Sequence, residues 1–364
     1  MSTGDEPVLI NAVLAATEPL TGLTLGELGA VVRPLDVPGG YDLSVRLGFP
    51  VERHRHLLEP RLRQHLAESG CRSPGQIQFG WQVQAEGGHR VAPLPGVANV
   101  IAVASGKGGV GKSTVAVNLA LALVAEGARV GLLDADIYGP SQPLLLGLAG
   151  QRPQGGDPGK VLPVARGGLA MMSIGLLVGE DQPMAWRGPM ATQALVQLLG
   201  DTQWGELDYL LVDMPPGTGD IQLTLSQRVP LSGAVIVTTP QEMSLLDARR
   251  GLQMFRKVEV PVLGVIENMS FHACPACGHR EALFGSDGGR RVAERYSAPL
   301  LAELPLDARV RAGSDEGQPV VLALPDSDLA RGYRHAALAA VAQLAARHVA
   351  QPGAFPKITV GDDE

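Results

Sequence analysis

The stretch SGKGGVGKST, residues 105–114, decides the fold of this 364-residue chain. Gly106 to Ser113 fits the pattern G-x-x-x-x-G-K-S, whose glycines let backbone N–H groups close around phosphate oxygens. The apolar run NVIAVAS precedes it and the helical pattern KSTVAVNLALALVAEG follows it. A glycine-rich turn without a ligand is the alternative, but strand, loop, lysine and helix in this order favour a nucleotide site. The predicted ATP-binding residues of the loop are Gly106, Lys107, Gly108, Gly109, Val110, Gly111, Lys112, Ser113 and Thr114.

A magnesium ion that accompanies the nucleotide needs oxygen ligands from the same region. Lys112 is expected to reach the β and γ phosphates, and Ser113 to offer its hydroxyl to Mg²⁺. The apolar strand YLLVD ends in Asp213, which we predict to be the second magnesium-binding residue, although such an aspartate is often only a helix cap. Gly217 and Gly219 leave the following loop free to move with the γ-phosphate.

Two further acids, Asp134 and Asp136, end the strand LLDAD. A hydrolase of this kind must orient a water molecule for in-line attack, and one of these carboxylates is able to do so. The alternative is a pair of solvated or capping acids at a strand end.

From residue 100 onward, short apolar runs alternate with helical patterns. This alternation predicts an α/β fold with a mostly parallel, twisted sheet flanked by helices, and ligands beyond the carboxyl ends of the strands. Upstream, a hairpin, an amphipathic helix and a third strand indicate a small α+β unit. The predicted domains are the α+β unit at 1–88, a linker at 89–98, the ATPase domain at 99–350 and a mobile tail at 351–364.

Composition limits the partners and the compartment. The net charge of -7 and the 4% aromatic content argue against binding to nucleic acid or to an anionic membrane. The three cysteines, the lack of a leader-like start and the lack of an apolar run of roughly 18 residues favour the cytoplasm.

The segment HACPACGH, residues 272–279, carries a CxxC pair, Cys274 and Cys277, which can place two thiolates on one metal. A redox CxxC normally opens a helix, whereas this one is followed by Gly278. A zinc knuckle completed by His272 and His279, an iron–sulfur cluster shared across a dimer, and a purely structural turn remain as alternatives.

Taken together, these residues resemble the deviant Walker A ATPases related to MinD, ParA and the nitrogenase iron protein, whose hallmark is a lysine after the first loop glycine, here Lys107. Within that group, DADIYGPS, WRGPM, DMPPGTGDIQLTLSQ, TTPQEMSLLDARRG and IENMSFHACPACGH closely resemble the Mrp/ApbC family of iron–sulfur cluster carriers, over residues 97–350. The resemblance implies an ATP-hydrolysing homodimer that delivers a 4Fe–4S cluster to apo-proteins and works with cluster assembly proteins.

The resemblance also implies roles for single residues. Lys107 would point into the nucleotide of a facing subunit, Asp136 would position the attacking water, and Asn268 would read the adenine base. Arg187, in WRGP, receives no role. The cluster would be held by Cys274 and Cys277, doubled by a two-fold axis to the four thiolates that a 4Fe–4S cluster takes.

The N-terminal unit resembles the small domain found in iron–sulfur assembly proteins but departs from it at one point. Where related domains carry a cysteine-containing T-x-P-x-C-P turn, this chain has VRLGFPVERHRH, and Cys71 reads as a packed thiol. We therefore expect a docking module rather than a second cluster site.

Other functions stay open at this point. A MinD/ParA-like spatial organiser would bind membrane or DNA, which the acidic end GDDE does not favour. A zinc-bound regulatory ATPase and an electron-transfer reductase are the remaining alternatives.

Overall fold

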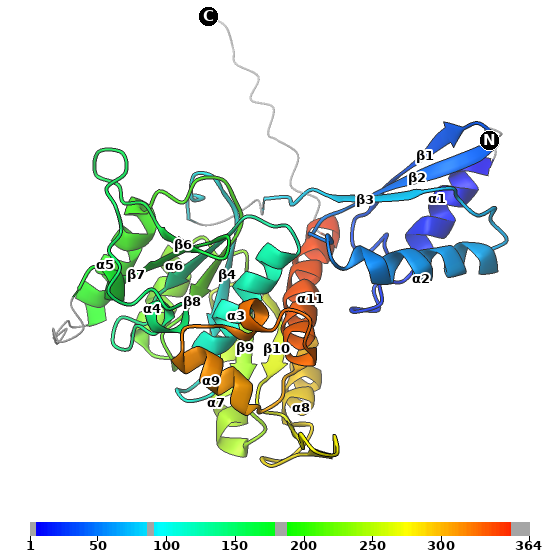
Figure 1. Cartoon of the computed structure of the whole chain (residues 1–364). Coiled ribbons are helices and arrows are strands. Elements are labelled where there is room, and N and C mark those ends of the chain that lie inside the picture. The colour runs from blue at the N-terminus through cyan, green and yellow to red at the C-terminus, as the bar shows by residue number, and fades with distance from the viewer. Residues whose placement is uncertain (1–4, 86–90, 179–187, 351–364) are drawn as a thin grey trace, which may run out of the picture.

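The computed structural model describes residues 5–85, 91–178 and 188–350. Arg187, the predicted tail 351–364 and the first two residues of the predicted linker lie outside these ranges. The described residues form three sheets: a large one in the body of the molecule, a small one near the N-terminus (Figure 1), and a two-stranded hairpin.

The large sheet has eight strands in the order β13-β10-β9-β4-β8-β5-β7-β6. Every neighbouring pair is parallel except β6 and β7. The predicted α/β fold with a mostly parallel sheet is therefore confirmed. The strands are β4 (Val97–Ala104), β5 (Val130–Asp134), β6 (Val164–Arg166), β7 (Leu169–Ser173), β8 (Leu207–Asp213), β9 (Gly233–Thr238), β10 (Val262–Glu267) and β13 (Leu300–Glu303).

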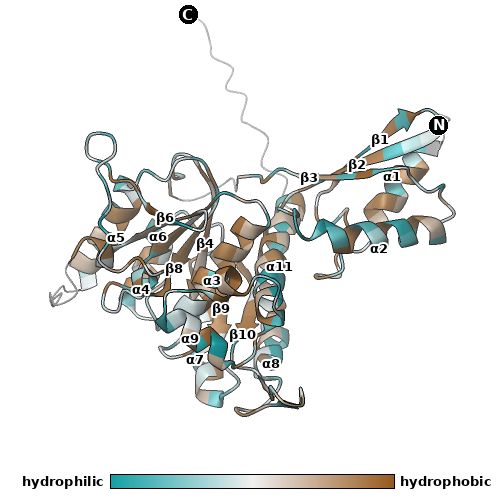
Figure 2. Ribbon diagram, in the orientation of Figure 1, coloured by the Kyte–Doolittle hydropathy of each residue, from teal (hydrophilic) through white to brown (hydrophobic). Residues whose placement is uncertain are grey.

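Helices cover both faces of this sheet, because its strands are apolar on both sides. Along β4, Ile101 and Val103 pack toward α3 and α11, whereas Val100 and Ala102 pack toward the opposite layer of α5, α6, α7 and α8. Figure 2 shows the apolar strands enclosed between the helices. The helices are α3 (Lys112–Ala125), α4 (Gln142–Leu145), α5 (Gly188–Asp201), α6 (Asp220–Arg228), α7 (Glu242–Lys257), α8 (Gly288–Arg295), α9 (Ala308–Asp315), α10 (Val320–Ala323) and α11 (Asp328–Ala350).

The N-terminal unit is a three-stranded sheet with two helices. Strands β1 and β2 form an antiparallel hairpin, and β3 runs parallel to β2. A helix before the hairpin, α1, was not predicted from the sequence. The elements are α1 (Asp5–Ala15), β1 (Val31–Val37), β2 (Gly40–Leu47), α2 (Arg55–Glu68) and β3 (Ile77–Trp81).

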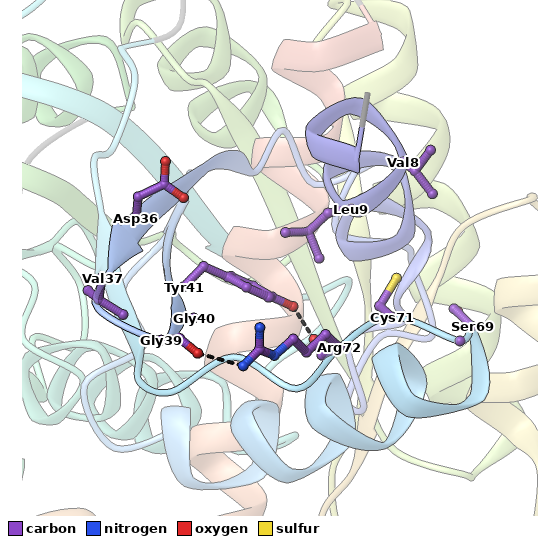
Figure 3. A pocket seen from close by; sticks show the side chains of 11 residues that line it. Val8, Leu9, Asp36, Val37, Gly39, Gly40, Tyr41, Ser69, Cys71 and Arg72 are labelled. Atoms are coloured by element: carbon purple, nitrogen blue, oxygen red, sulfur yellow. Dashed lines mark hydrogen bonds between the residues drawn. The ribbon is translucent and has the colours of Figure 1, made fainter. Parts of the chain in front are cut away.

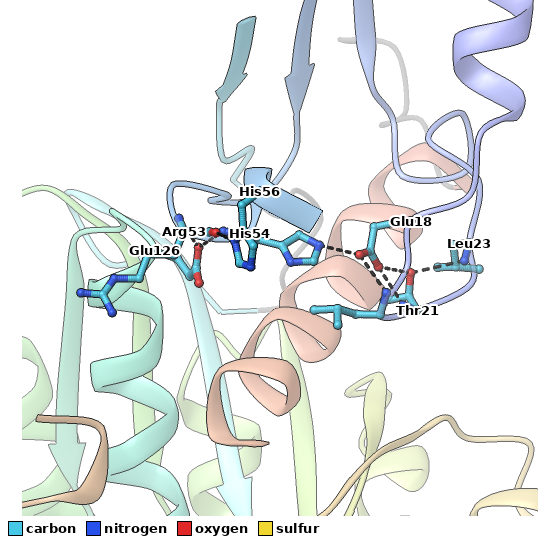
Figure 4. Close-up of polar contacts among 8 residues, drawn as sticks. Glu18, Thr21, Leu23, Arg53, His54, His56 and Glu126 are labelled. Carbon is cyan, nitrogen blue, oxygen red and sulfur yellow. Dashed lines mark hydrogen bonds and ion pairs between the residues drawn. The ribbon is translucent and has the colours of Figure 1, made fainter. Parts of the chain in front are cut away.

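A buried polar junction joins this unit to the phosphate-loop helix α3 (Figure 4). Glu126 follows the last residue of α3, and its Oε2 accepts hydrogen bonds from the backbone N–H groups of Arg53 and His54 at 2.8 and 3.0 Å. These N–H groups lie at the start of α2, where an acidic side chain is favourable. The His54 ring in turn meets Glu18 at 2.7 Å, and Glu18, His54 and Glu126 are all buried.

A pocket of about 700 Å³ lies in the N-terminal unit between α1, the β1–β2 turn and the end of α2 (Figure 3). Arg72 Nη2 donates to the carbonyl of Gly39 at 2.5 Å, and the Tyr41 hydroxyl donates to the carbonyl of Arg72. Cys71 lines this pocket and is half-buried, so the expectation of an ordinary packed thiol holds only in part.

None of the helices in the described ranges is both long enough and apolar enough to cross a membrane.

Candidate nucleotide site and cysteine hairpin

The phosphate loop connects the central strand β4 to α3, as the sequence predicts. Gly109 and Gly111 have φ angles of 82° and 79°, which favour glycine. A side chain on Gly106 would also clash, since a Cβ there would lie 2.2 Å from the carbonyl carbon of Asp247 in α7. Glycine is therefore favoured at Gly109 and Gly111 by the backbone angle and at Gly106 by close packing.

Lys112, Ser113 and Asp213 come together at the carboxyl ends of β4 and β8. The Lys112 ammonium forms a buried ion pair with Asp213 Oδ1, and its Nζ lies 3.2 Å from the Ser113 hydroxyl. The exposed fraction is 5% for Lys112 and 0% for Asp213. This arrangement gathers one ammonium, one hydroxyl and one carboxylate at the carboxyl edge of the sheet.

Asp134 and Asp136 lie in different environments, although only one residue separates them. Asp134 is fully buried, pairs in register with Asp213, and accepts a hydrogen bond from the Ser173 hydroxyl at 3.0 Å. Burial, then the Asp213 charge, raise the pKa of Asp134 to about 7. Burial also raises the pKa of Asp136, which remains half-exposed and can contact solvent. The geometry thus favours Asp136 over Asp134 as the acid that meets a water molecule.

Sequence reasoning missed Gln142, whose buried side chain lies among these acids. Its only local signal is its place in GPSQ, shortly after DAD. Its contacts to Ser113, Asp134 and Asp213 depend on three separate elements meeting in space.

Lys107 lies in the loop with a half-buried side chain. The Ser105 hydroxyl donates to its carbonyl at 2.8 Å, which fixes the backbone. Its ammonium forms no ion pair with any residue in the described ranges. Within the described ranges, the Lys107 charge is therefore not neutralised by a nearby carboxylate.

Asn268 connects the phosphate loop to the segment after β10. Its side-chain Nδ2 donates to the carbonyl of Val110 at 2.9 Å, and it packs closely against Gly111. The preceding Glu267 is buried and accepts hydrogen bonds from the Ser270 hydroxyl, at 2.6 Å, and from the Gly289 N–H. The segment leading to the cysteines is therefore anchored directly behind the phosphate loop.

Cys274 and Cys277 lie in the turn of a short hairpin formed by β11 (His272–Ala273) and β12 (Arg280–Glu281). The Gly278 N–H donates to the carbonyl of Cys274 at 2.8 Å and closes the turn. Cys274 is half-buried and Cys277 is exposed. Hydrogen bonds from the backbone N–H groups of Cys277 and Ala276, and from the Cys277 thiol, lower the pKa of Cys274. The turn therefore favours the thiolate that binds metals.

A zinc site completed within one chain is not formed by the residues that the structure describes. No group of three or more His, Cys, Asp or Glu side chains in those ranges is arranged to hold a metal ion. His272 instead directs Nδ1 toward the carbonyl of Leu306 at 3.2 Å. Among the described residues, the hairpin therefore offers two thiols and no third candidate metal ligand beside them.

A parallel sheet whose central strand leads into a glycine-rich loop and a helix, with an aspartate ending the next strand, defines a P-loop nucleotide-binding protein. The family model for the ParA group described as NUBPL iron-transfer P-loop NTPase matches residues 96–341. The chain belongs to this family.

Known proteins agree with this assignment. An iron–sulfur cluster carrier protein of Escherichia coli K12 is 50% identical over 311 residues, covering 83% of both chains. The mouse iron–sulfur cluster transfer protein NUBPL is 50% identical over 277 residues, covering 76% of this chain and 86% of its own. A solved Archaeoglobus fulgidus nucleotide-binding protein in complex with ADP is 41% identical, with a TM-score of 0.55 over 61% of this chain and 87% of its own.

Proposed function

We propose that this chain is an ATP-dependent iron–sulfur cluster carrier. Two copies would hold one 4Fe–4S cluster as cargo between them and deliver it to apo-proteins. The names of the Escherichia coli and mouse relatives support the cargo, and the ADP complex of the Archaeoglobus protein supports the nucleotide.

The nucleotide half of the proposal rests on Lys112, Ser113 and Asp213. A hydroxyl and a carboxylate are hard oxygen ligands of the kind that Mg²⁺ prefers, so the donor set fits this ion. When ATP binds, Lys112 leaves Asp213 and pairs with the β and γ phosphates. Oδ1 of Asp213 is then free to face Mg²⁺. Bound Mg²⁺ would supply charge neutralisation for phosphoryl transfer. Asp136 would orient the water.

Lys107 would complete the site of a facing subunit. A second cation arriving from outside stabilises the charge that develops on the transferred phosphoryl group. The absence of an ion-pair partner for Lys107 among the described residues supports this role, because its charge is free to act elsewhere.

The cluster half of the proposal follows from the number of ligands. Cys274 and Cys277 supply two thiolates, and a 4Fe–4S cluster takes four. A two-fold axis beside the hairpin presents the same turn twice and completes the set without further residues. The exposure of Cys277 supports this placement, since a partner subunit can reach it.

The contact between Asn268 and Val110 carries the coupling of the two halves. Asn268 touches the phosphate loop, and the segment 268–274 leads from this contact to Cys274. A change of the loop on ATP binding or hydrolysis would therefore be transmitted to the hairpin over a short, anchored path. This provides a physical route by which nucleotide could loosen the cluster. In this role Asn268 could still contact adenine, the role implied by the family resemblance.

A cluster-transfer assay tests the proposed function. Reconstituted protein is mixed with an apo-enzyme that requires a 4Fe–4S cluster, and enzyme activity is followed with and without Mg²⁺-ATP. Wild type and Cys71→Ser should both activate the target, whereas Cys274→Ser should not. Cys71 is a matched control because it lies outside the hairpin. Activation by Cys274→Ser equal to that by wild type would reject the proposal.

A further inference from the structure

The amide of Gln142 joins three parts of the nucleotide site. Its Nε2 donates to Asp213 Oδ2 at 2.8 Å and to the carbonyl of Ser113 at 3.1 Å. Its backbone N–H donates to Asp134 Oδ2 at 3.1 Å, and the whole residue has an exposed fraction of 0%. One buried side chain thus ties the end of β8 to the start of α3.

The chemistry of these neighbours fixes the orientation of the amide. The Asp213 carboxylate and the Ser113 carbonyl are both acceptors, so only the NH₂ group of Gln142 can face them. Its Oε1 then points elsewhere, is buried, and accepts no hydrogen bond from the described residues. A buried acceptor with no protein donor is suited to accept a hydrogen bond from a bound water molecule.

The two oxygens of Asp213 have different partners. Oδ1 pairs with Lys112, and Oδ2 accepts from Gln142. Once Lys112 turns to the phosphates, the Gln142 amide is the contact that keeps the carboxylate in its present orientation. We infer that Gln142 is a positioning residue that aims the free oxygen of Asp213 at Mg²⁺. This inference rests on the proposed binding of Mg²⁺-ATP.

If Gln142 acts through Mg²⁺, its replacement should weaken ATP binding in the presence of Mg²⁺ but not in its absence. The Kd of ATP is measured by calorimetry in excess Mg²⁺ and in EDTA, for wild type and for Gln142→Met, which keeps the volume and removes both donors. Hydrogen bonds to a charged group are worth about ten- to a hundredfold in an equilibrium constant. The Kd in Mg²⁺ should therefore rise about tenfold or more, while the Kd in EDTA should change by about twofold at most.

Ser173→Ala is the matched control. It removes one equally buried hydrogen bond from Asp134, at 3.0 Å, but no contact to Asp213. Both of its Kd values should stay within about twofold of wild type. A Gln142→Met variant weakened equally in Mg²⁺ and EDTA, or a Ser173→Ala variant with the same Mg²⁺-specific loss, would show a merely structural role and overturn the inference.

Two further readouts keep the test decisive. Thermal unfolding checks that each variant is folded. If Gln142→Met is not, Gln142→Ala removes the same donors without adding bulk or charge, and its Kd must rise more in Mg²⁺ than in EDTA. Wild-type protein that binds no ATP under either condition would reject the proposed function itself, whereas normal wild-type binding with an unaffected Gln142→Met rejects only the role of Gln142.

Discussion

Asn268 donates a hydrogen bond from its side-chain amide to the carbonyl of Val110 across 2.9 Å, although 158 positions separate the two residues. This bond places the phosphate loop and the start of the cysteine-bearing segment in direct contact. Under the proposed function, a nucleotide-driven change in the loop would reach the cysteine-bearing segment through this contact. Communication between the two sites is therefore expected to be local.

Replacement of Lys112 by alanine should weaken ATP binding on the order of 100-fold, because it removes the cation that neutralises the phosphates. Calorimetric titration with Mg²⁺-ATP measures the effect. Lys160→Ala is the control, since Lys160 donates to the carbonyl of Gly200 on the surface. Unchanged affinity in Lys112→Ala would mean that the phosphates bind elsewhere.

Lys107→Ala should reduce ATP turnover far more than ATP affinity. Cations supplied across an interface are worth roughly 10³–10⁵ in rate, and we expect the lower end of that range or less. Turnover is measured for the variant alone and mixed with hydrolysis-deficient Asp136→Asn. Mixed dimers that regain part of the activity would show that Lys107 serves the facing site. If mixing gives no rescue, Lys107 acts in its own subunit.

Much of this site could be predicted because its signals are local. Each signal lies in one short segment with an apolar strand: the loop glycines and Lys112 follow β4, and aspartates end β5 and β8. The role of Gln142 could not be predicted, because its contacts depend on three elements that are distant in sequence. Neither could the Glu126 junction, since no motif marks a carboxylate that caps another unit's helix.

The elements that escaped prediction have weak patterns. The apolar residues of α1 are not confined to one helical face, as DEPVLINAVLA shows. Strands β6 and β13 are only three and four residues long, and β7, LAMMS, lacks β-branched residues. Packing against neighbouring elements, rather than the local sequence pattern, stabilises these helices and strands.

Glu126→Ala should lower the free energy of unfolding by about 2 kcal/mol, because the buried backbone N–H of His54 and the part-buried N–H of Arg53, at the start of α2, lose a charged acceptor. Urea unfolding measures the loss. Glu52→Ala is the control: it lies beside the junction and loses only an exposed ion pair with Arg55. Equal effects of the two variants would contradict the importance of the junction.

His335, on α11, should make stability depend on pH. Burial lowers the pKa of His335 from its ordinary value of 6.5, with opposing contributions from Glu18 and His54. The unfolded chain therefore takes up the proton first as the pH falls. The free energy of unfolding should decline as the pH drops through 6.5 toward the folded pKa, and then level off.

Urea unfolding of wild type and His335→Gln at about pH 7.5 and about pH 5.5 tests this assignment. The variant should lose less stability than wild type between the two conditions. An identical loss in both proteins would assign the pH dependence to other groups.

The shared cluster is tested most directly by iron content and molar mass together. Protein reconstituted anaerobically with iron and sulfide is assayed for iron, sulfide and zinc. Its molar mass is measured by light scattering with and without the cluster. The account predicts a dimer with about two irons per chain, and a monomer without iron for Cys274→Ser and Cys277→Ser. One tightly held zinc per monomer, with no cluster absorption, would contradict it.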